Sequence, residues 1–338
     1  MTDIPKQINN IGALIDQAHE EISSRPRPHM GASMLGHPCD RWLWLSFRWA
    51  VQPKFPGRVL RLFRRGHKEE DLIVSDLRRI GIDVACTGAA QAKVDFGCHV
   101  SGSIDGIISN IPNMDDRIAA ILECKTHSDK SFQDMVKNGL EKSKPQHWVQ
   151  CHIYMMGRRL SHALYYAVNK NDDSIYTEWV KYDEVVAKKA VERGRKLALE
   201  ERLPPPISSD PSWYQCKFCD AYSFCHSKEP TKHANCRTCA NVTPRSDGTF
   251  HCEHWQDVIP LDHQYEGCDS HLLHPDLVPW QFEGTEDGLH VTWMIDGKPV
   301  LNGPDGYKSR EIVANPEACG MDVVETTKSI FPGAEVIG

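Results

Sequence analysis

Gly102-Ser103-Ile104-Asp105-Gly106 and Ile121-Leu122-Glu123-Cys124-Lys125 are the two stretches that decide the fold of this 338-residue chain. Each contains a short apolar run that is typical of a β-strand, and an acidic residue follows the run. Lys125 stands two positions after Glu123. Two carboxylates and an ammonium placed in this way suit a divalent cation that is held by oxygen ligands. Because the pattern is common on its own, its meaning depends on the rest of the chain.

The neighbouring sequence predicts the other elements of an α/β protein. A helix from about Val59 to Ile80 carries His67 and ends at Gly81. We expect the strand that begins at Val100 to continue beyond Asp105 through Ile107 and Ile108. Residues 145–156 are predicted to form a helix that carries Gln150 and Tyr154 on one face. Further helices are expected at 8–23, from Ser33 as N-cap to Arg48, and at 183–201. Further strands are expected in two hairpins, 163–168 with 175–180 over the turn 171–173, and 289–295 with 298–301 over Asp296-Gly297.

The order of these motifs carries a resemblance. Gly66-His67 in a helix, Asp105 after a strand, Glu123-Cys124-Lys125 at the next strand and Gln150-x-x-x-Tyr154 in a helix follow one another. This order resembles the PD-(D/E)XK nuclease superfamily, in particular its RecB-like branch, over roughly residues 30–230. The resemblance implies a restriction-endonuclease-like core, in which helices flank a mixed central sheet.

The resemblance also implies a metal centre. Asp105 and Glu123 would coordinate Mg²⁺ or Mn²⁺, and the backbone carbonyl of Cys124 would add a ligand. His67 would add a nitrogen ligand, which favours Mn²⁺ relative to a site made of oxygen atoms alone. The simpler alternatives are that Asp105 is a turn residue and that His67 is a surface residue of its helix.

The remaining residues of this motif would act on the substrate. Lys125 would orient or deprotonate the attacking water and stabilise negative charge. Gln150 and Tyr154 would hold Lys125, the water or a DNA phosphate, unless they pack at the edge of the core. Glu69 and Glu70 suit a solvated helix face, although Glu70, one turn from His67, is a candidate for a supporting role.

Cysteines form a second group of candidate ligands. Seven of the 13 cysteines lie between Cys216 and Cys268, and the N-terminus has no features of a secretory signal. In a reducing compartment, clustered cysteines more often bind metal than form disulfides.

The first cysteine set has the spacing C-x2-C-x5-C, and a single cysteine lies far upstream of it. This pattern resembles the iron–sulfur branch of RecB-like nucleases, which includes the AddB nuclease domain and nucleases associated with CRISPR adaptation. The resemblance implies a [4Fe–4S] cluster that ties the N-terminal helices to the end of the nuclease core. From spacing alone, zinc is an open alternative. The implied ligands are Cys39, Cys216, Cys219 and Cys225.

The second cysteine set lies outside the region of the resemblance. We expect a zinc ribbon-like site formed by Cys236, Cys239, Cys252 and Cys268, and His254 or His271 could replace one thiolate. The predicted domains are therefore residues 1–230, with the nuclease core, and residues 231–338, a smaller zinc-binding and β-rich region.

The overall charge of −7 does not favour a polyanion as partner, so binding of DNA would depend on local basic residues. The candidates are Arg61, Arg64, Arg65 and Lys144, for which surface solvation is the alternative. Phe55, Trp42, Trp44 and Trp148 would stack on unpaired bases or belong to the core. With 40% apolar residues and no run of about 20 of them, neither a membrane span nor a membrane partner is expected. A cytoplasmic location is the default expectation.

The function predicted from the sequence is that of a metal-dependent DNA exonuclease. It would hydrolyse phosphodiester bonds from the ends of single- or double-stranded DNA in recombination or repair, where a recombination partner protein is expected. One alternative is a non-catalytic DNA-binding or scaffold protein that keeps the fold. A second alternative is a zinc-dependent interaction protein whose function lies in residues 231–338.

Overall fold

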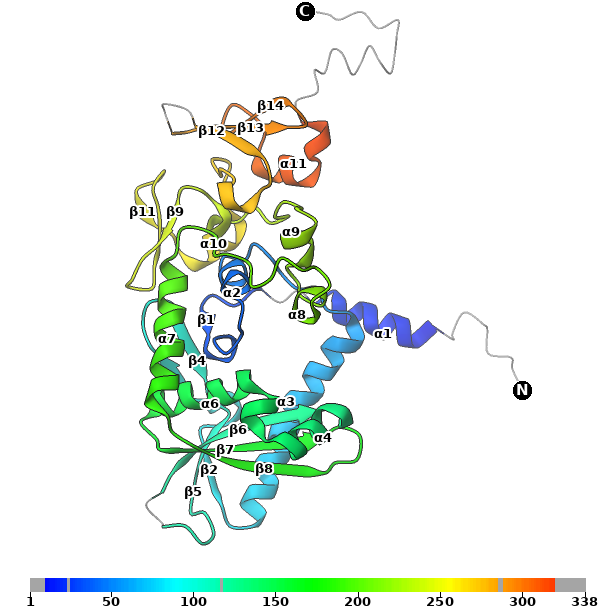
Figure 1. The fold of residues 1–338 in the computed structure, drawn as a ribbon, viewed down its shortest axis with the longest axis vertical. Helices are drawn as coiled ribbons and strands as arrows, with labels where there is room; N and C mark the ends of the chain where they lie inside the picture. The colour runs from blue at the N-terminus through cyan, green and yellow to red at the C-terminus, as the bar shows by residue number, and fades with distance from the viewer. Residues whose placement is uncertain (1–9, 23–24, 116–117, 285–287, 320–338) are drawn as a thin grey trace, which may run out of the picture. The chain divides into compact units, whose positions relative to one another are not determined.

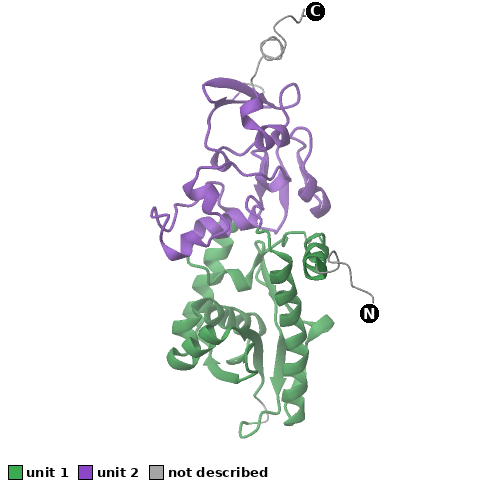
Figure 2. Ribbon diagram, turned by 90° about the vertical axis from the view of Figure 1, so that its right-hand side faces the viewer, with its two compact units in different colours: residues 1–38, 53–198 green, residues 39–52, 199–338 purple. Residues whose placement is uncertain are grey.

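The computed structural model describes residues 10–22, 25–115, 118–284 and 288–319. Two compact units are formed, unit 1 by residues 1–38 and 53–198 and unit 2 by residues 39–52 and 199–338 (Figure 2). These units do not coincide with a boundary near residue 230, since residues 199–230 and the segment 39–52 belong to unit 2. Residues 8, 9 and 23 of the first predicted helix, and residues 320–338 of the predicted C-terminal domain, lie outside the described residues.

Unit 1 is a mixed α/β unit (Figure 1). Its helices are α1 (Ile11–Glu20), α3 (Gly57–Arg79), α4 (Asp129–Asn138), α5 (Leu140–Ser143), α6 (Pro145–Arg158) and α7 (Glu184–Leu199). Its strands are β1 (Met30–Gly31), β2 (Asp83–Ala85), β3 (Lys93–Asp95), β4 (Val100–Ser103), β5 (Gly106–Ser109), β6 (Ala120–His127), β7 (His162–Asn169) and β8 (Ile175–Lys181).

The main sheet of unit 1 has five strands in the order β2-β5-β6-β7-β8. β6 and β7 are parallel and the other neighbours are antiparallel, so the sheet is mixed, as the sequence predicted. On one face, Leu122 and Cys124 of β6 pack in a core with Ile73 and Leu77 of α3. Because side chains alternate along a strand, Glu123 and Lys125 point to the other face, where α6 packs on β6 and β7.

A bend at Asp105 separates two strands that the sequence predicted to be continuous. β4 belongs to a three-stranded sheet of order β1-β4-β3, whereas β5 belongs to the main sheet, so that prediction was wrong. Gly102 lets β4 approach its neighbours closely before the bend. A Cβ atom at this position would lie 2.9 Å from Cβ of Ala32 and 3.0 Å from Cε1 of Tyr154.

Several predicted elements are present with small changes at their ends. α3 is followed by Gly81 with a φ of +89°, a conformation in which glycine is favoured. β7 and β8 form the predicted hairpin, and Asp173 in its turn has a φ of 59°. The N-cap predicted at Ser33 was wrong, because Ser33 lies in a 3₁₀ turn (Ala32–Met34).

Unit 2 consists of short helices and two small sheets. Its helices are α2 (Asp40–Phe47), α8 (Tyr214–Lys217), α9 (Tyr222–His226), α10 (Leu261–Glu266) and α11 (Ser309–Ala314). One sheet contains β9 (Val242–Pro244), β10 (Phe250–Cys252) and β11 (Asp257–Val258), and the other β12 (Gln281–Gly284), β13 (Val291–Ile295) and β14 (Lys298–Asn302). Asp296 and Gly297 between β13 and β14 have φ angles of 49° and 78°, which suits the predicted tight hairpin.

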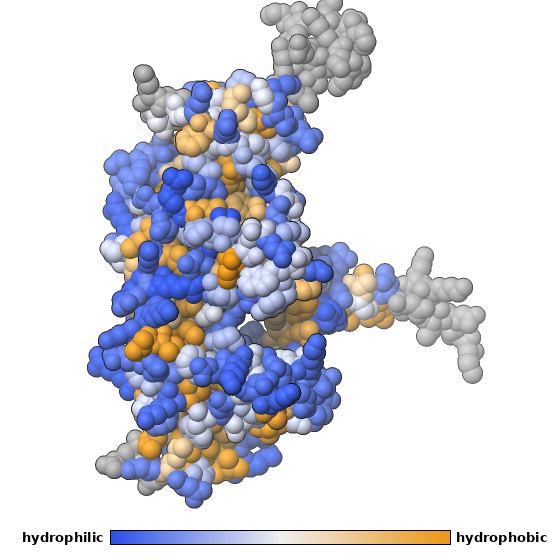
Figure 3. Space-filling view, viewed as in Figure 1, coloured by the Kyte–Doolittle hydropathy of each residue, from blue (hydrophilic) through white to orange (hydrophobic). Residues whose placement is uncertain are grey.

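None of the helices in the described part of the chain combines the length and the apolar character that a membrane span requires. On the face of the molecule in Figure 3, hydrophobic residues are interspersed with hydrophilic ones.

Candidate metal centres

The bend at Asp105 places its carboxylate against an open edge of β6. Pairing between β5 and β6 begins with Gly106 opposite Leu122, so the rest of β6 has no partner on that side in β5. The backbone N–H of Cys124 donates instead to Oδ2 of Asp105, over 2.9 Å. Asp105 is therefore fixed beside the strand that carries Glu123 and Lys125.

Glu123 is completely buried, and its two oxygen atoms have different surroundings. Oε1 pairs with the ammonium group of Lys125, whereas Oε2 has no hydrogen-bond partner among the described residues. Burial raises the pKa of Glu123; Lys125 opposes this shift and Asp105 reinforces it. Burial alone would lower the pKa of Lys125, but Glu123 and Asp105 together raise it.

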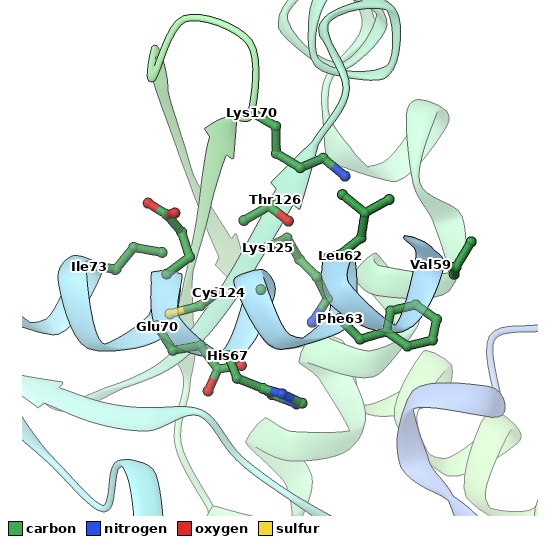
Figure 4. Close-up of a pocket in the computed structure, with 12 residues that line it drawn as sticks. Val59, Leu62, Phe63, His67, Glu70, Ile73, Cys124, Lys125, Thr126 and Lys170 are labelled. Atoms are coloured by element: carbon green, nitrogen blue, oxygen red, sulfur yellow. The ribbon is translucent and has the colours of Figure 1, made fainter. Parts of the chain in front are cut away.

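Glu70 joins this group from α3. Burial and the carboxylate of Asp105 raise its pKa, whereas His67 and Lys125 lower it. Figure 4 shows Glu70 and His67 extending from the same side of α3, with Cys124 of β6 near them. The side chain of His67 is exposed. From the sequence, Glu70 was interpreted either as part of a solvated helix face or as a supporting residue of the site. The supporting role was indicated by its spacing of three residues from His67.

A cavity of about 590 Å³ lies beside these residues (Figure 4). Glu70, His67, Lys125 and Lys170 contribute its polar lining, while Val59, Leu62 and Phe63 are apolar. Phe63 is 46% exposed and Phe55 40%, and their rings meet edge to face with centroids 4.9 Å apart. Neither Phe63 nor Lys170 was singled out from the sequence, although Phe63 lies one helical turn before His67.

Gln150 and Tyr154 lie on α6 and are buried on the Glu123 side of the sheet. Nε2 of Gln150 donates to the Tyr154 hydroxyl over 3.3 Å. Burial, and next the negative charge of Glu123, raise the pKa of Tyr154. Tyr154 is therefore within electrostatic reach of Glu123.

A histidine–tyrosine group that the sequence did not indicate continues along the same face. The hydroxyl of Tyr165, opposite Glu123 in the sheet, lies 2.8 Å from Nε2 of His127 and 2.8 Å from Nδ1 of His147. Burial and nearby lysines lower the pKa of His127 to about 4 and that of His147 to about 3. Both imidazoles are therefore neutral near pH 7.

The predicted nucleic-acid-binding residues differ in their surroundings. Arg61 forms an ion pair with Asp16 of α1, and Nη2 of Arg65 lies 3.5 Å from the carbonyl oxygen of Lys170. Nζ of Lys144 donates to the carbonyl oxygen of Ser143 over 3.0 Å, and Arg64 is exposed.

The four aromatic candidates for base stacking also differ. Trp44 is a buried core residue whose Nε1–H donates to the carbonyl oxygen of Glu200. Trp42 packs against the same core, and Trp148 contacts His152 edge to face. Phe55 is the exposed one.

The first cysteine set is brought together in unit 2. Cys39 is the N-cap of α2, and its sulfur accepts a hydrogen bond from the backbone N–H of Trp42 at 3.4 Å. Burial, and after it the proximity of the Cys39 thiol, raise the pKa of Cys216. Cys219 and Cys225 are also within electrostatic reach of Cys39. Arg41 hydrogen-bonds the sulfur of Cys225 and lowers its pKa, which opposes the effect of burial.

The second cysteine set lines a cavity of about 310 Å³, also in unit 2. All four sulfur-bearing residues, Cys236, Cys239, Cys252 and Cys268, contribute to its wall. None of the 13 cysteines, all of which are described, forms a disulfide. Within the described residues, no group of three or more His, Cys, Asp or Glu side chains is placed to hold a metal ion.

Comparisons with known proteins find no matching family model and no matching curated protein. Among solved structures, the protein SSO0001 is similar at 15% identity, with a TM-score of 0.37 over 64% of this chain and 96% of that chain. An alkaline exonuclease from Laribacter hongkongensis, LHK-Exo, is 13% identical over 55% of this chain and 90% of its own, with a TM-score of 0.34. The same exonuclease in complex with dAMP gives a TM-score of 0.38.

Proposed function

We propose that this protein is a metal-dependent DNA exonuclease whose site is formed by Asp105, Glu123 and Lys125. The observation that carries the proposal is Glu123, a fully buried acid with one oxygen paired to Lys125 and the other without a hydrogen-bond partner. With Asp105 and Glu70 beside it, three carboxylates surround one ammonium group. Such an excess of negative charge around a buried carboxylate is costly unless a cation balances it.

The donor atoms fit Mg²⁺ or Mn²⁺. Carboxylate oxygens of Asp105 and Glu123 are the hard ligands that these ions prefer. The N–H and C=O groups of one strand residue point to the same edge, and the N–H of Cys124 points to Asp105. Its carbonyl is therefore directed to the open edge, which supports its assignment as a third ligand. Glu70 and His67 of α3 are assigned to the side of the site that faces the cavity.

Each residue near the cation site has a separate task. A bound cation would supply Lewis acidity and neutralise phosphate charge. Because the acids raise the pKa of Lys125, its amine remains an ammonium and stabilises negative charge on the phosphate. Gln150 and Tyr154 position the Glu123 side of the site through their hydrogen bond. Lys125 was predicted either to stabilise charge or to deprotonate water, and its raised pKa favours charge stabilisation.

DNA would reach the site along the exposed side of α3. Arg64 and Arg65 of α3 and Lys170 at the cavity give local positive charge to a chain whose formal net charge is −7. Binding should therefore weaken strongly as salt rises. Because the sequence resembles RecB-like nucleases, we also propose attack at DNA ends and a role in recombination or repair.

We assign a [4Fe–4S] cluster to Cys39, Cys216, Cys219 and Cys225 in the same proposal. The backbone N–H of Ala221 and the guanidinium of Arg41 favour the thiolates of Cys219 and Cys225, the form that binds iron. Anaerobically purified protein should be brown, and Cys216→Ala should lose the visible absorbance while Cys319→Ser keeps it. A colourless preparation that contains only zinc would refute the cluster.

The nuclease proposal is tested with end-labelled linear DNA and with covalently closed circular DNA. With Mn²⁺ or Mg²⁺, the protein should degrade the linear DNA and spare the circle. Asp105→Asn, Glu123→Gln and Lys125→Met should each lower the rate by at least about 100-fold. Glu192→Gln, which changes an exposed acid of α7, is the matched control. Full activity of Glu123→Gln, or equal activity in excess EDTA, would refute the mechanism.

A further inference from the structure

We infer that Cys236, Cys239, Cys252 and Cys268 form a four-thiolate Zn²⁺ site that fixes the segment 39–52 within unit 2. Binding would form four Zn–S bonds and release the thiol protons to solvent. This site is separate from the residues of the proposed nuclease centre and does not depend on nuclease activity.

The four thiols come from three parts of the chain and meet at one cavity. Cys236 begins the 3₁₀ turn Cys236–Thr238 and Cys239 follows it, Cys252 ends β10, and Cys268 follows α10. A cavity of about 310 Å³ lies between them. Four thiolates are the ligand set of a closed structural zinc site, in which Zn–S distances are about 2.3 Å.

Backbone N–H groups already point at the sulfur atoms. The N–H of Trp255 donates to Sγ of Cys252 at 3.5 Å. The N–H groups of Asn241 and Leu272 are directed at Cys239, and that of Gly267 at Cys236. Buried neutral thiols need no such donors, whereas thiolates are stabilised by them. Burial nevertheless raises the pKa of Cys236 to about 11 and that of Cys239 to about 12, and the Cys236 thiol donates to the carbonyl oxygen of His263 at 3.5 Å, so both are neutral thiols that would lose their protons when zinc binds.

Cys268 is assigned as the fourth ligand in competition with His271. Cys268 lines the same cavity as Cys236. His271 also lines the cavity, and its buried Nδ1 has no hydrogen-bond partner among the described residues. Its Nε2 lies 2.9 Å from the carbonyl oxygen of Asn235, so this nitrogen carries the proton and holds the ring. Zinc generally prefers thiolates in closed structural sites, which favours Cys268.

The zinc site would hold the segment 39–52 through side chains that flank Cys236. Nη1 of Arg237 donates to the carbonyl oxygen of Phe47 over 3.0 Å, and its guanidinium lies 3.8 Å from the ring centre of Trp49. Nδ2 of Asn235 reaches the carbonyl oxygen of Trp49 at 3.5 Å. Arg237 is 1% exposed, so its position depends on the turn that Cys236 and Cys239 would fix.

The first experiment measures zinc by inductively coupled plasma mass spectrometry on the full-length protein. Cys252→Ser and Cys268→Ser should each hold one zinc ion per chain fewer than the wild type. Cys319→Ser, a buried cysteine of unit 2 away from the cavity, and His271→Gln should keep the wild-type content. Zinc content that is unchanged in Cys252→Ser overturns the site, and loss of zinc in His271→Gln but not in Cys268→Ser overturns the four-thiolate set.

A second experiment does not depend on how the variants fold. Wild-type protein is alkylated before and after treatment with a zinc chelator, and each cysteine is read separately by peptide mass spectrometry. The four cysteines should become reactive after chelation, and amide exchange in residues 44–50 should accelerate. Equal alkylation of these four cysteines with and without chelator overturns the proposal, whatever the protein does to DNA.

Discussion

Replacement of Lys125 by methionine should destabilise unit 1 more than replacement of Glu123 by glutamine. Lys125 supplies the ion-pair partner of Glu123, whose side chain is 0% exposed, whereas that of Lys125 is 25% exposed. In Lys125→Met, the buried carboxyl group must therefore take up a proton in order to fold. In Glu123→Gln, the ammonium group keeps access to solvent through the cavity that it lines.

The size of this effect follows from the free energy that is needed to protonate Glu123 in the folded variant. The ordinary pKa of the glutamate is 4.5. For a wild-type Glu123 that is ionised beside Lys125, the penalty at about 1.4 kcal/mol per pH unit is about 2 kcal/mol at pH 6 and about 3.5 kcal/mol at pH 7. The sign follows because the folded variant binds a proton that the unfolded chain has released, so stability falls as pH rises between pH 6 and 7. Glu123→Gln should cost about 1–2 kcal/mol with little pH dependence.

The assay is urea unfolding of full-length protein in EDTA at pH 6 and pH 7, monitored by signals from unit 1. The double variant Glu123→Gln/Lys125→Met should be more stable than the sum of the two single effects predicts, by about 2 kcal/mol, because no charge is left unpaired. A loss of less than about 1 kcal/mol for Lys125→Met at pH 7, or a loss that shrinks as pH rises, would contradict the reasoning.

Three further predictions concern packing and titration. Gly102→Ala should lose about 1–3 kcal/mol, since its Cβ would lie 2.9 and 3.0 Å from neighbouring carbon atoms, whereas Gly66→Ala, with nothing within 4 Å, should be neutral or stabilising in thermal unfolding. In NMR titrations, His127 and His147 should remain neutral down to pH of about 4 and 3; titration near pH 6.5 would show that their burial is not maintained. Arg237→Met should lose about 2–3 kcal/mol and expose residues 44–50 to hydrogen exchange, and unchanged exchange would rule out its role in holding that segment.

The elements that the sequence predicted best are those that local interactions determine. α3 and α6 have apolar residues at helical spacing over several turns, and their predicted ranges agree with the structure within a few residues. The turn at Asp296-Gly297 was predictable because only a few residue types accept positive φ at both positions.

The errors concern interactions between distant parts of the chain. Whether β4 and β5 form one strand depends on the strands that they pair with. β4 pairs with β1 and β3, whereas β5 pairs with β2 and β6, and the local sequence does not indicate this difference. Cys39 caps α2 with its sulfur, which a search for Ser, Thr, Asp or Asn at helix starts does not find. Phe63 becomes a candidate for the site only because α3 packs along β6.

The break in the strand at Asp105 is also what creates the candidate nuclease site. If β4 continued straight into β5, antiparallel pairing with β6 would extend past Gly106 and Leu122 and place Ile104 opposite Cys124. The N–H and C=O groups of Cys124 would then be used in the sheet, and Asp105 would have no reason to approach them. With the bend, the carboxylate of Asp105 takes the N–H, and the carbonyl on the same edge becomes available beside Glu123. The same bend therefore ends one sheet, begins the next and brings together the oxygen atoms that would bind a cation.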